Sequence, residues 1–324
     1  MEITILGAGT WGIALAEVLV ANNLDVSVWH YKSNYIDQLS KKKNHSRLKL
    51  KISEKIKFIS DSKLILDSSL VLICLPSQSI REVLLSLKLK NQYYINASKG
   101  IELDSGKLIS QVIIDTTSAS DATIACISGP SHAEELANRI PTVISVASRN
   151  DEFSKSIQKS FSNSFLRLYQ SDSIEAMQVG GAVKNIISIA SGICVGLGYG
   201  DNTIAALITR GIQEIVRFAG LYTHETTSLL GISGIGDLIV TSTSKHSRNK
   251  HLGQSVGEGK TLIQALNEMD MVVEGVETTK SVYQMAKKND ISMPICNEVY
   301  YILFKNKDPR KAINELMLRE LIQE

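Results

Sequence analysis

Residues 3–12 read Ile3-Thr4-Ile5-Leu6-Gly7-Ala8-Gly9-Thr10-Trp11-Gly12, a short apolar run followed by glycines in the spacing G-x-G-x-x-G. The apolar run predicts a β-strand, and residues 11–20 have the pattern of a helix. In that context the first glycine permits a tight turn, the second lets the backbone approach a pyrophosphate, and the third allows close helix–strand packing. The stretch therefore predicts a βαβ unit that binds a dinucleotide at a helix N-terminus.

The rest of the first half alternates short apolar runs with helical segments. These runs are continuously apolar, which indicates strands that are covered on both faces. We expect an α/β Rossmann-type domain, with a doubly wound and mostly parallel sheet, over residues 1–172. The further strands are expected at residues 26–29, 70–75, 93–96, 123–127 and 143–146.

From about residue 173 the apolar residues follow the helical period of 3.6, as over residues 262–269. Asp172 or Ser173 is the expected N-cap of the first long helix. Asp308-Pro309 gives the last helix an N-cap and a first-turn proline. We therefore expect an all-α C-terminal domain over residues 173–324.

Composition excludes several classes of protein. The net charge of +2 argues against a nucleic-acid partner, and the lysine run Lys41-Lys42-Lys43 is interpreted as a solvated face. Four cysteines without a C-x-x-C pair predict neither a disulfide framework nor a metal site. No apolar run approaches the ~20 residues that span a bilayer. Since the chain opens on a predicted strand, we expect no signal peptide and a cytoplasmic protein that is not embedded in a membrane.

The end of the second strand bears on the choice of cofactor. An acidic residue there would bind the ribose hydroxyls of NAD, but the strand runs into His30-Tyr31-Lys32, and the first acidic residue is Asp37. Lys32 could face a 2′-phosphate, so we predict that NADP(H) is accepted at least as well as NAD(H). The alternative is that Lys32 is only a surface lysine.

Two segments follow strands of the first half. Ser98-Lys99-Gly100 comes after residues 93–96, and Ser128-Gly129-Pro130-Ser131 comes after residues 123–127. Ligands of doubly wound sheets bind at these carboxyl ends. Taken alone, Lys99 could be a surface lysine and the second segment a turn with a helix cap.

Three further segments lie in the helical half. Gly180-Gly181 stands inside a predicted helix, where each glycine costs roughly 1 kcal/mol relative to alanine, and so indicates close approach of a ligand or another helix. Lys184 follows about one turn later. Gly231–Leu238 is expected to be a glycine-rich loop with Asp237 as an N-cap. Ser247-Arg248-Asn249 offers a planar guanidinium and polar donors to a phosphate. Helix packing, a helix cap and a surface arginine are the alternative interpretations.

Together, and in this order, these segments resemble the bacterial NAD(P)-dependent glycerol-3-phosphate dehydrogenases. The resemblance extends from the first strand to Pro294 and beyond, and its second half is more specific than the glycine turn. It rests on Gly7–Gly12, Ser98-Lys99-Gly100, Ser128–Ser131, Gly181–Asn185, Ala206–Gly211, Gly234–Leu238, Ser247-Arg248-Asn249 and Val273-Glu274-Gly275. The departures are Cys194-Val195, where many members carry an aspartate before the glycine, and His132, which replaces an aromatic or apolar residue.

The resemblance implies reduction of dihydroxyacetone phosphate to sn-glycerol 3-phosphate for glycerophospholipid synthesis, by a homodimer without a metal. Lys184 would be the catalytic lysine, which stabilises the alkoxide and delivers the proton, with Asp237 and Lys99 beside it. The expected cofactor contacts are Gly7, Gly9, Thr10, Trp11, Gly12, Tyr31, Lys32, Lys99, Ala133, Arg248, Val272 and Glu274. The expected substrate contacts are Lys99, Gly129, Ser131, Lys184, Asp237, Ser247, Arg248 and Asn249.

Two alternatives stay open at this point. A related two-domain dehydrogenase of 3-hydroxy acids tends to carry K-x-x-N in its catalytic helix, whereas here Asn185 directly follows Lys184 and Ile187 stands three residues on. A cofactor-sensing protein without turnover would need only the first half of the chain. Retention of Lys184, Asp237 and Arg248 argues against it.

Overall fold

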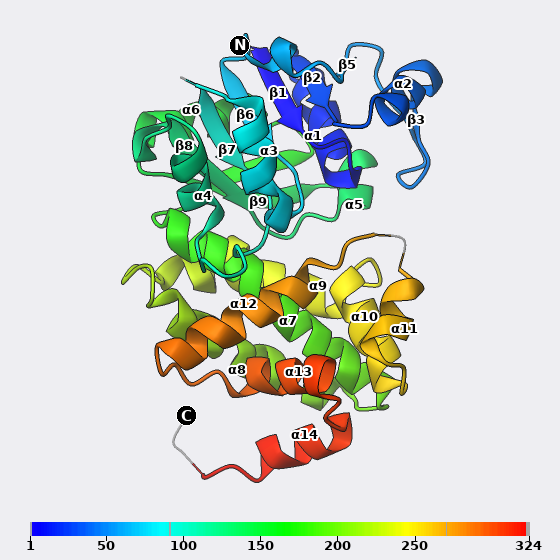
Figure 1. Ribbon diagram of the computed structural model, residues 1–324, viewed down its shortest axis with the longest axis vertical. Coiled ribbons are helices and arrows are strands. Elements are labelled where there is room, and N and C mark those ends of the chain that lie inside the picture. The colour runs from blue at the N-terminus through cyan, green and yellow to red at the C-terminus, as the bar shows by residue number, and fades with distance from the viewer. Residues whose placement is uncertain (1, 91, 270, 322–324) are drawn as a thin grey trace. The chain divides into compact units, whose positions relative to one another are not determined.

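A computed structural model describes residues 2–90, 92–269 and 271–321 (Figure 1). The chain forms two compact units. The first comprises Met1–Lys99 and Lys107–Gln178, and the second comprises Gly100–Gly106 and Val179–Glu324. The expected domain boundary after residue 172 stays a prediction, because a compact unit is not by itself an independently folding domain.

The first unit is built on a sheet of eight strands. The strands are β1 (Glu2–Leu6), β2 (Asp25–Trp29), β5 (Lys57–Ile59), β6 (Leu70–Ile73), β7 (Tyr93–Asn96), β8 (Ile124–Ser128), β9 (Thr142–Ser148) and β10 (Leu166–Gln170). Their order across the sheet is β10-β9-β8-β7-β6-β1-β2-β5, and every pair is parallel except β8 with β9. A separate hairpin pairs β3 (Asn44–His45) with β4 (Leu50–Lys51). The predicted α/β fold with a mostly parallel sheet is confirmed.

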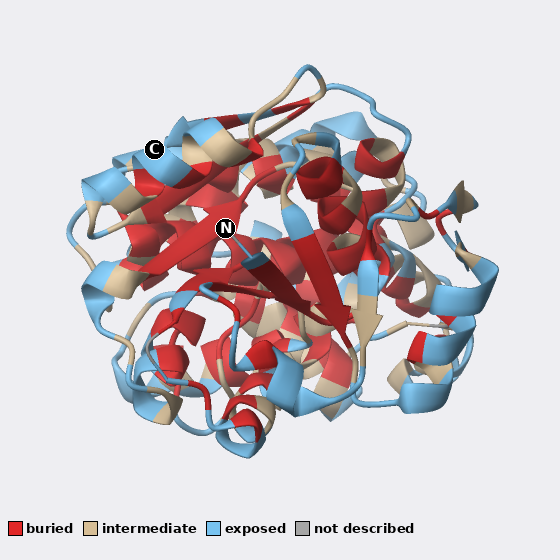
Figure 2. Cartoon of the chain, turned by 90° about the horizontal axis from the view of Figure 1, so that it is seen from above, coloured by how far each residue is buried: buried red, intermediate tan, exposed pale blue. Residues whose placement is uncertain are grey.

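Both faces of this sheet are covered, which accounts for the continuously apolar strands. Along β1, Ile3 and Ile5 join a core with α1 (Thr10–Ala21), α5 (Ala133–Ala137) and α6 (Asp151–Phe161). Leu6 joins a second core with α3 (Ile80–Leu87) and α4 (Ile109–Thr116). Figure 2 shows the central strands as buried ribbon. The unit also contains α2 (Ser33–Lys42), which follows β2.

The second unit is helical, as predicted. Its helices are α7 (Ile174–Gly196), which begins in the first unit, α8 (Asp201–Ala219), α9 (Asp237–Thr243), α10 (Arg248–Gly257), α11 (Leu262–Asn267), α12 (Glu274–Lys288), α13 (Pro294–Lys305) and α14 (Pro309–Met317). Both predicted caps are confirmed: the Ser173 hydroxyl accepts from the Ala176 N–H at 3.1 Å, and the Asp308 carboxylate accepts from the Lys311 N–H at 2.8 Å.

Helix α7 is long and apolar enough to cross a membrane by length and composition. Within the described residues it is the one helix of that kind, and 89% of its apolar window is buried in the protein. Such burial is the environment of a core helix.

Glycines set the spacing between α7 and α10. A methyl group on Gly192 would collide with the Lys250 carbonyl oxygen, and one on Gly253 would collide with the Ile189 carbonyl oxygen. The next glycine along each helix, Gly196 and Gly257, meets the opposite backbone in the same way. The two helices therefore touch through their backbones, at a separation that no other residue type permits.

Two expectations about residues 231–238 were wrong, and the strands β3, β4, β5 and β10 were not among those predicted. Strands β5 and β10 were not predicted, because β5 is very short and β10 alternates exposed with buried residues at an edge of the sheet. The segment Ile232–Gly236 is not a loop but a π-helical turn that runs into α9. Asp237 is accordingly the first residue of α9, and Gly236 is the N-cap. A methyl group on Gly234 would collide with the Leu229 backbone, so this glycine serves close packing rather than loop flexibility.

Candidate active site

The glycine turn after β1 has the shape that a dinucleotide requires. Gly7 has a φ of +114°, and a Cβ there would lie 2.5 Å from the Cys74 carbonyl oxygen. A Cβ on Gly12 would collide with the Gly7 carbonyl oxygen. Beside Gly9, by contrast, no described atom lies within 4 Å of the position of a Cβ. Two glycines are thus fixed by packing, and the third keeps the backbone open to a ligand.

The N-terminus of α1 supplies the complementary charge. The helix begins at Thr10 with Gly9 as its N-cap, and among the described residues no side chain caps it or places a carboxylate in its first turn. Its first N–H groups and the positive end of its dipole therefore face the position of a pyrophosphate. The expected contacts Thr10 and Trp11 occupy this first turn, so the residues present fit a dinucleotide.

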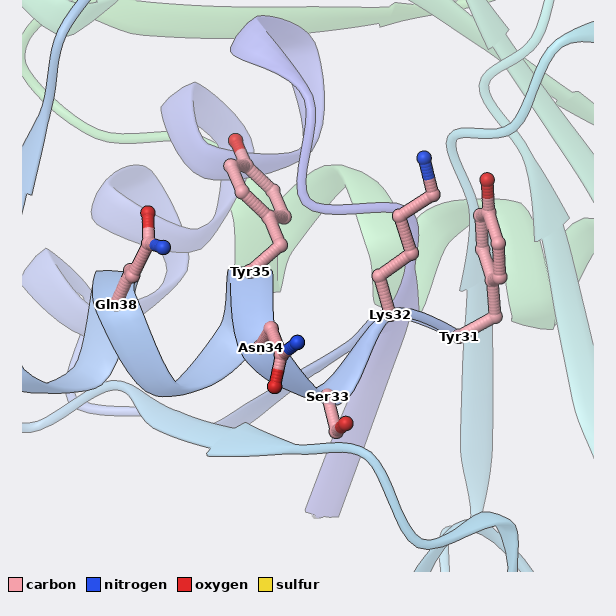
Figure 3. Close-up of a pocket in the computed structure, with 6 residues that line it drawn as sticks. All are labelled: Tyr31, Lys32, Ser33, Asn34, Tyr35 and Gln38. Carbon is pink, nitrogen blue, oxygen red and sulfur yellow. The ribbon is translucent and has the colours of Figure 1, made fainter.

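The end of β2 opens into a surface recess of about 410 Å³. Figure 3 shows the Tyr31 and Lys32 side chains extending side by side, and the Lys32 ammonium lies 5.4 Å from the Tyr31 ring centre. The Tyr31 ring also stacks on His30 with 4.7 Å between ring centres. The lining residues are Tyr31, Lys32, Ser33, Asn34, Tyr35 and Gln38, none of which is acidic. The recess therefore suits a phosphate better than a pair of ribose hydroxyls.

Lys99, Gly129 and Ser131 come together at the carboxyl ends of β7 and β8. The Lys99 ammonium donates to the Gly129 carbonyl oxygen at 3.0 Å, and the Ser131 hydroxyl donates to the same oxygen at 2.8 Å. Gly129 has a φ of +150°, and a Cβ there would lie 2.9 Å from the Ile144 Cα. Ala133 follows as the buried first residue of α5. The Lys99 ammonium and the Ser131 hydroxyl thus lie on either side of the backbone turn at Gly129.

Lys184 lies inside the helical unit on α7 and contacts two side chains of α9. Its ammonium donates to Asp237 Oδ1 at 2.5 Å and to Thr241 Oγ1 at 2.5 Å. The exposed fraction of the Lys184 side chain is 5%, and that of Asp237 is 1%. The Thr241 hydroxyl donates to the Asp237 carbonyl oxygen at 2.7 Å, which turns its lone pairs toward the ammonium. The result is a buried cation with its orientation fixed by two acceptors.

Thr241 was not predicted as a site residue. Asp237 and Thr241 are four residues apart, and in a helix such residues lie on one face. That spacing was available in the sequence. It did not predict a shared contact, because residues 231–238 were expected to form a loop and not part of a helix.

Ser247 is joined to Lys184 through a buried network that includes Thr241. The Ser188 hydroxyl donates to the Thr241 carbonyl oxygen at 2.7 Å and lies 3.0 Å from the Ser247 hydroxyl. Ser247 Oγ also accepts from the Lys250 N–H at 3.3 Å, so it caps α10. These contacts fix the start of α10 relative to α7 and α9.

The Asn249 amide links three helices. Its Nδ2 donates to Asn185 Oδ1 at 2.9 Å, and its Oδ1 accepts from the Gly275 N–H at 3.0 Å. The side chain expected to bind substrate directly therefore also bonds to α7 and α12. Asn185, which the sequence did not single out for a role of its own, is the partner that orients it.

Arg248 is exposed and reaches toward the residues before α12. Its Nη1 donates to the Val272 carbonyl oxygen at 2.8 Å, and Glu274 begins α12 two residues later. The structure thus brings Arg248 and Val272 together. Across the residues it describes, no three histidine, cysteine, aspartate or glutamate side chains are grouped so as to hold a metal ion.

Comparison with known proteins covers nearly the whole chain. Residues 2–154 match the family described as NAD-dependent glycerol-3-phosphate dehydrogenase N-terminus, and residues 173–314 match its C-terminus. Glycerol-3-phosphate dehydrogenase (NAD(P)+) from Chlorobium phaeobacteroides is 40% identical over 99% of this chain and 98% of its own length. The Staphylococcus aureus protein of that name is 43% identical, over 98% of each.

Solved structures agree. The crystal structure of glycerol-3-phosphate dehydrogenase from Coxiella burnetii superposes with a TM-score of 0.93 and 34% identity, over 98% of this chain and 99% of that chain. A D-mandelate dehydrogenase complex with NADH superposes with a TM-score of 0.59 and 13% identity, over 98% of this chain and 100% of that chain. At that identity the likeness shows a shared fold only.

Proposed function

Because this chain belongs to the NAD-dependent glycerol-3-phosphate dehydrogenase family, we propose that Lys184, held by Asp237 and Thr241, donates the proton in its reaction. The protein is an NAD(P)-dependent oxidoreductase that reversibly reduces dihydroxyacetone phosphate to sn-glycerol 3-phosphate. Family membership and the reaction exclude the two rivals that the sequence left open. The observation that carries the proposal is the buried Lys184–Asp237–Thr241 cluster.

The roles of the chain's own residues follow from this cluster. A bound reduced nicotinamide would supply the hydride to C2 of the substrate, and the carbonyl oxygen would then become negatively charged. The Lys184 ammonium stabilises the negative charge on that oxygen and transfers its proton there. Asp237 and Thr241 hold Nζ in place, and a buried site removes competing water.

We propose that Arg248 binds the substrate phosphate. A guanidinium is planar and can bind two phosphate oxygens at once. Ser247 and Asn249 border the same helix start, and their contacts to α7 and α12 hold Arg248 at a fixed place on the helical unit. Lys99, Gly129 and Ser131 are proposed to contact both substrate and cofactor.

For the cofactor, we propose that the first unit binds NADPH at least as well as NADH. Gly7, Gly9 and Gly12 shape the pyrophosphate turn, and Tyr31 and Lys32 would meet the adenosine 2′-phosphate. The recess beside them holds a cation and no carboxylate. Ala133, Val272 and Glu274 are proposed as the remaining cofactor contacts.

We further propose a cytoplasmic homodimer whose product supplies glycerophospholipid synthesis. Met317 and Leu318 at the end of α14 are 77% and 85% exposed, and such apolar surface is what a second copy could cover. Light scattering of the purified protein tests the dimer, and a monomer at assay concentration would contradict it.

The experiment that tests the function follows NADPH absorbance with dihydroxyacetone phosphate, using wild type and Lys184→Arg in parallel. The wild-type protein should turn over this substrate and not a 3-keto acid. The arginine variant keeps the charge but is too basic to deliver the proton, so it should bind NADPH and turn over very slowly. Normal turnover by that variant would exclude Lys184 as the proton donor.

A further inference from the structure

The chain leaves the first unit directly after Lys99. Residues 100–106 belong to the helical unit, and the chain returns to the first unit at Lys107. Lys99 is thus joined by a single peptide bond to a segment that packs with the helices. We call residues 100–106 the crossing segment.

The crossing segment closes on itself. The Gly106 N–H donates to the Glu102 carbonyl oxygen at 3.1 Å, and the Ser105 hydroxyl donates to Glu102 Oε2 at 2.5 Å. Asp104 between them has a φ of +65°. These bonds make the segment a compact turn. Contacts at its two ends therefore fix the position of the whole segment.

Both ends are held by the helical unit. Tyr222, just after α8, donates its hydroxyl to the Gly106 carbonyl oxygen at 2.7 Å, and Ser281 on α12 donates to the Ile101 carbonyl oxygen at 3.4 Å. Burial raises the pKa of the Tyr222 hydroxyl, which therefore stays protonated and able to donate. Met285 on α12 packs so closely that a Cβ on Gly106 would lie 2.5 Å from its sulfur.

On its other side, Lys99 is fixed by the first unit. The Ser98 hydroxyl donates to the Leu75 carbonyl oxygen at 2.6 Å, and the Ser98 N–H donates to Asn96 Oδ1 at 3.0 Å. The backbone of Lys99 therefore lies between Ser98, which is bonded within the first unit, and Ile101, whose carbonyl oxygen is bonded within the second. A change at either anchor moves the point from which the Lys99 side chain extends.

We propose that Tyr222 is a positioning residue for the reaction: through the crossing segment it fixes the backbone of Lys99, and so the place where the Lys99 ammonium meets the substrate. This inference rests on the proposed role of Lys99. Tyr222 itself touches neither substrate nor cofactor in this scheme. Its effect on catalysis passes through Lys99 alone.

The test is a double-mutant cycle on the complete enzyme, with Tyr222→Phe, Lys99→Ala and the double variant. Tyr222→Phe should lower kcat/KM for dihydroxyacetone phosphate about fivefold, the effect of one ordinary hydrogen bond. The Kd for NADPH should change by no more than it does in Lys99→Ala, because Lys99 is also a proposed cofactor contact. In the Lys99→Ala background the same substitution should have no further effect on kcat/KM.

Tyr301→Phe is the matched control, because it removes a tyrosine hydroxyl of the helical unit that lies 3.2 Å from the Tyr283 hydroxyl and not at the crossing segment. It should leave kcat/KM unchanged. Thermal unfolding confirms that each variant is folded at the assay temperature. Gly106→Ala, which disturbs the same anchor from the other side, should act in the same direction as Tyr222→Phe.

The outcomes separate two failures. If Lys99→Ala keeps the full kcat/KM, the proposed role of Lys99 fails and the inference falls with it. If Lys99→Ala is defective but Tyr222→Phe has no effect, or an equal effect in both backgrounds, the role of Lys99 stands and the inference alone is overturned.

Discussion

Asp237 is almost fully buried, and its Oδ1 lies 2.5 Å from the Nζ of Lys184, which is also buried. Such a pair costs desolvation energy on both sides, and hydrophobic residues of similar volume would stabilise the fold at least as well. A buried pair in this position is therefore better explained by chemistry than by stability. Thr241, as the second acceptor, leaves the ammonium only a narrow choice of orientation.

The first prediction concerns turnover. Lys184→Ala removes the proton donor and should lower kcat roughly a thousandfold, within the range of general acid catalysis. Binding of NADPH should persist, since the glycine turn belongs to the other unit. Stopped-flow and titration of NADPH fluorescence measure the two quantities. Lys305→Ala, at an exposed position on α13, is the control and should behave as wild type.

The second prediction concerns stability at the same pair. Asp237→Ala leaves the Lys184 charge buried without its counter-ion and should lower the free energy of unfolding by about 3–5 kcal/mol. The double variant Lys184→Met/Asp237→Leu should regain most of that loss while staying inactive. Urea denaturation measures both. Equal stability of the single and double variants would contradict a buried charge at this site.

The third prediction concerns cofactor selectivity. Lys32→Ala should raise the KM for NADPH roughly tenfold, because a charge-assisted bond to the 2′-phosphate is lost. The KM for NADH should hardly change. Lys41→Ala, near the far end of α2, is the matched control for general loss of positive charge. A parallel rise in both KM values would show that Lys32 does not recognise the 2′-phosphate.

The fourth prediction concerns pH. Burial raises the pKa of the Glu214 carboxyl above its ordinary 4.5, although the Ile295 and Cys296 N–H groups donate to it at 2.7 and 3.1 Å. Because the folded protein holds this proton more tightly than the unfolded chain, Glu214 contributes most stability below pH 4.5. That contribution is lost as the pH rises through the raised pKa.

Glu214→Gln should therefore remove this part of the pH slope. It should also cost about 1–3 kcal/mol, since the amide turns an N–H toward a backbone N–H. Unfolding free energies of both proteins from pH 4.5 to neutrality provide the comparison. The same slope in the variant would mean that another group titrates.

The fifth prediction concerns the contact between α7 and α10. Gly192→Ala and Gly253→Ala each force a methyl group against an opposing carbonyl and should cost about 3 kcal/mol. Gly200→Ala, where no described atom lies within 4 Å of the added carbon, should cost far less. Thermal denaturation ranks the three. Similar melting temperatures for all of them would contradict a backbone contact.

Much of the fold was predictable because it depends on local patterns. Apolar runs, the glycine spacing and the caps at Ser173 and Asp308 each act within a few residues. Strand β10 was not predicted because it lies at the edge of the sheet. Its residues are partly exposed, so its sequence shows only a weak strand pattern. The segment 232–236 was misinterpreted because Gly234 serves close contact with the Leu229 backbone, and composition alone does not distinguish such a glycine from one in a loop.

The residues of the site likewise fall into those that local motifs predict and those that depend on contacts between helices. Lys184, Asp237 and Lys99 could be named from short motifs. The roles of Thr241 and Asn185 depend on which helices meet, since Thr241 contacts Lys184 across 57 positions of sequence. The crossing segment could not be predicted, because no local sequence pattern indicates that residues 100–106 pack with helices distant in the sequence.

The glycines of α7 and α10 also limit how the chain can change length. Insertion of one residue into α10 before Gly253 would turn that glycine by roughly 100° away from Ile189. A side chain would then stand where two backbones now touch. If Gly253 instead kept its place, Ser247 and Asn249 would turn away from their partners. Insertions and deletions in descendants of this protein should therefore accumulate between these helices, and the helices themselves should keep a constant number of residues.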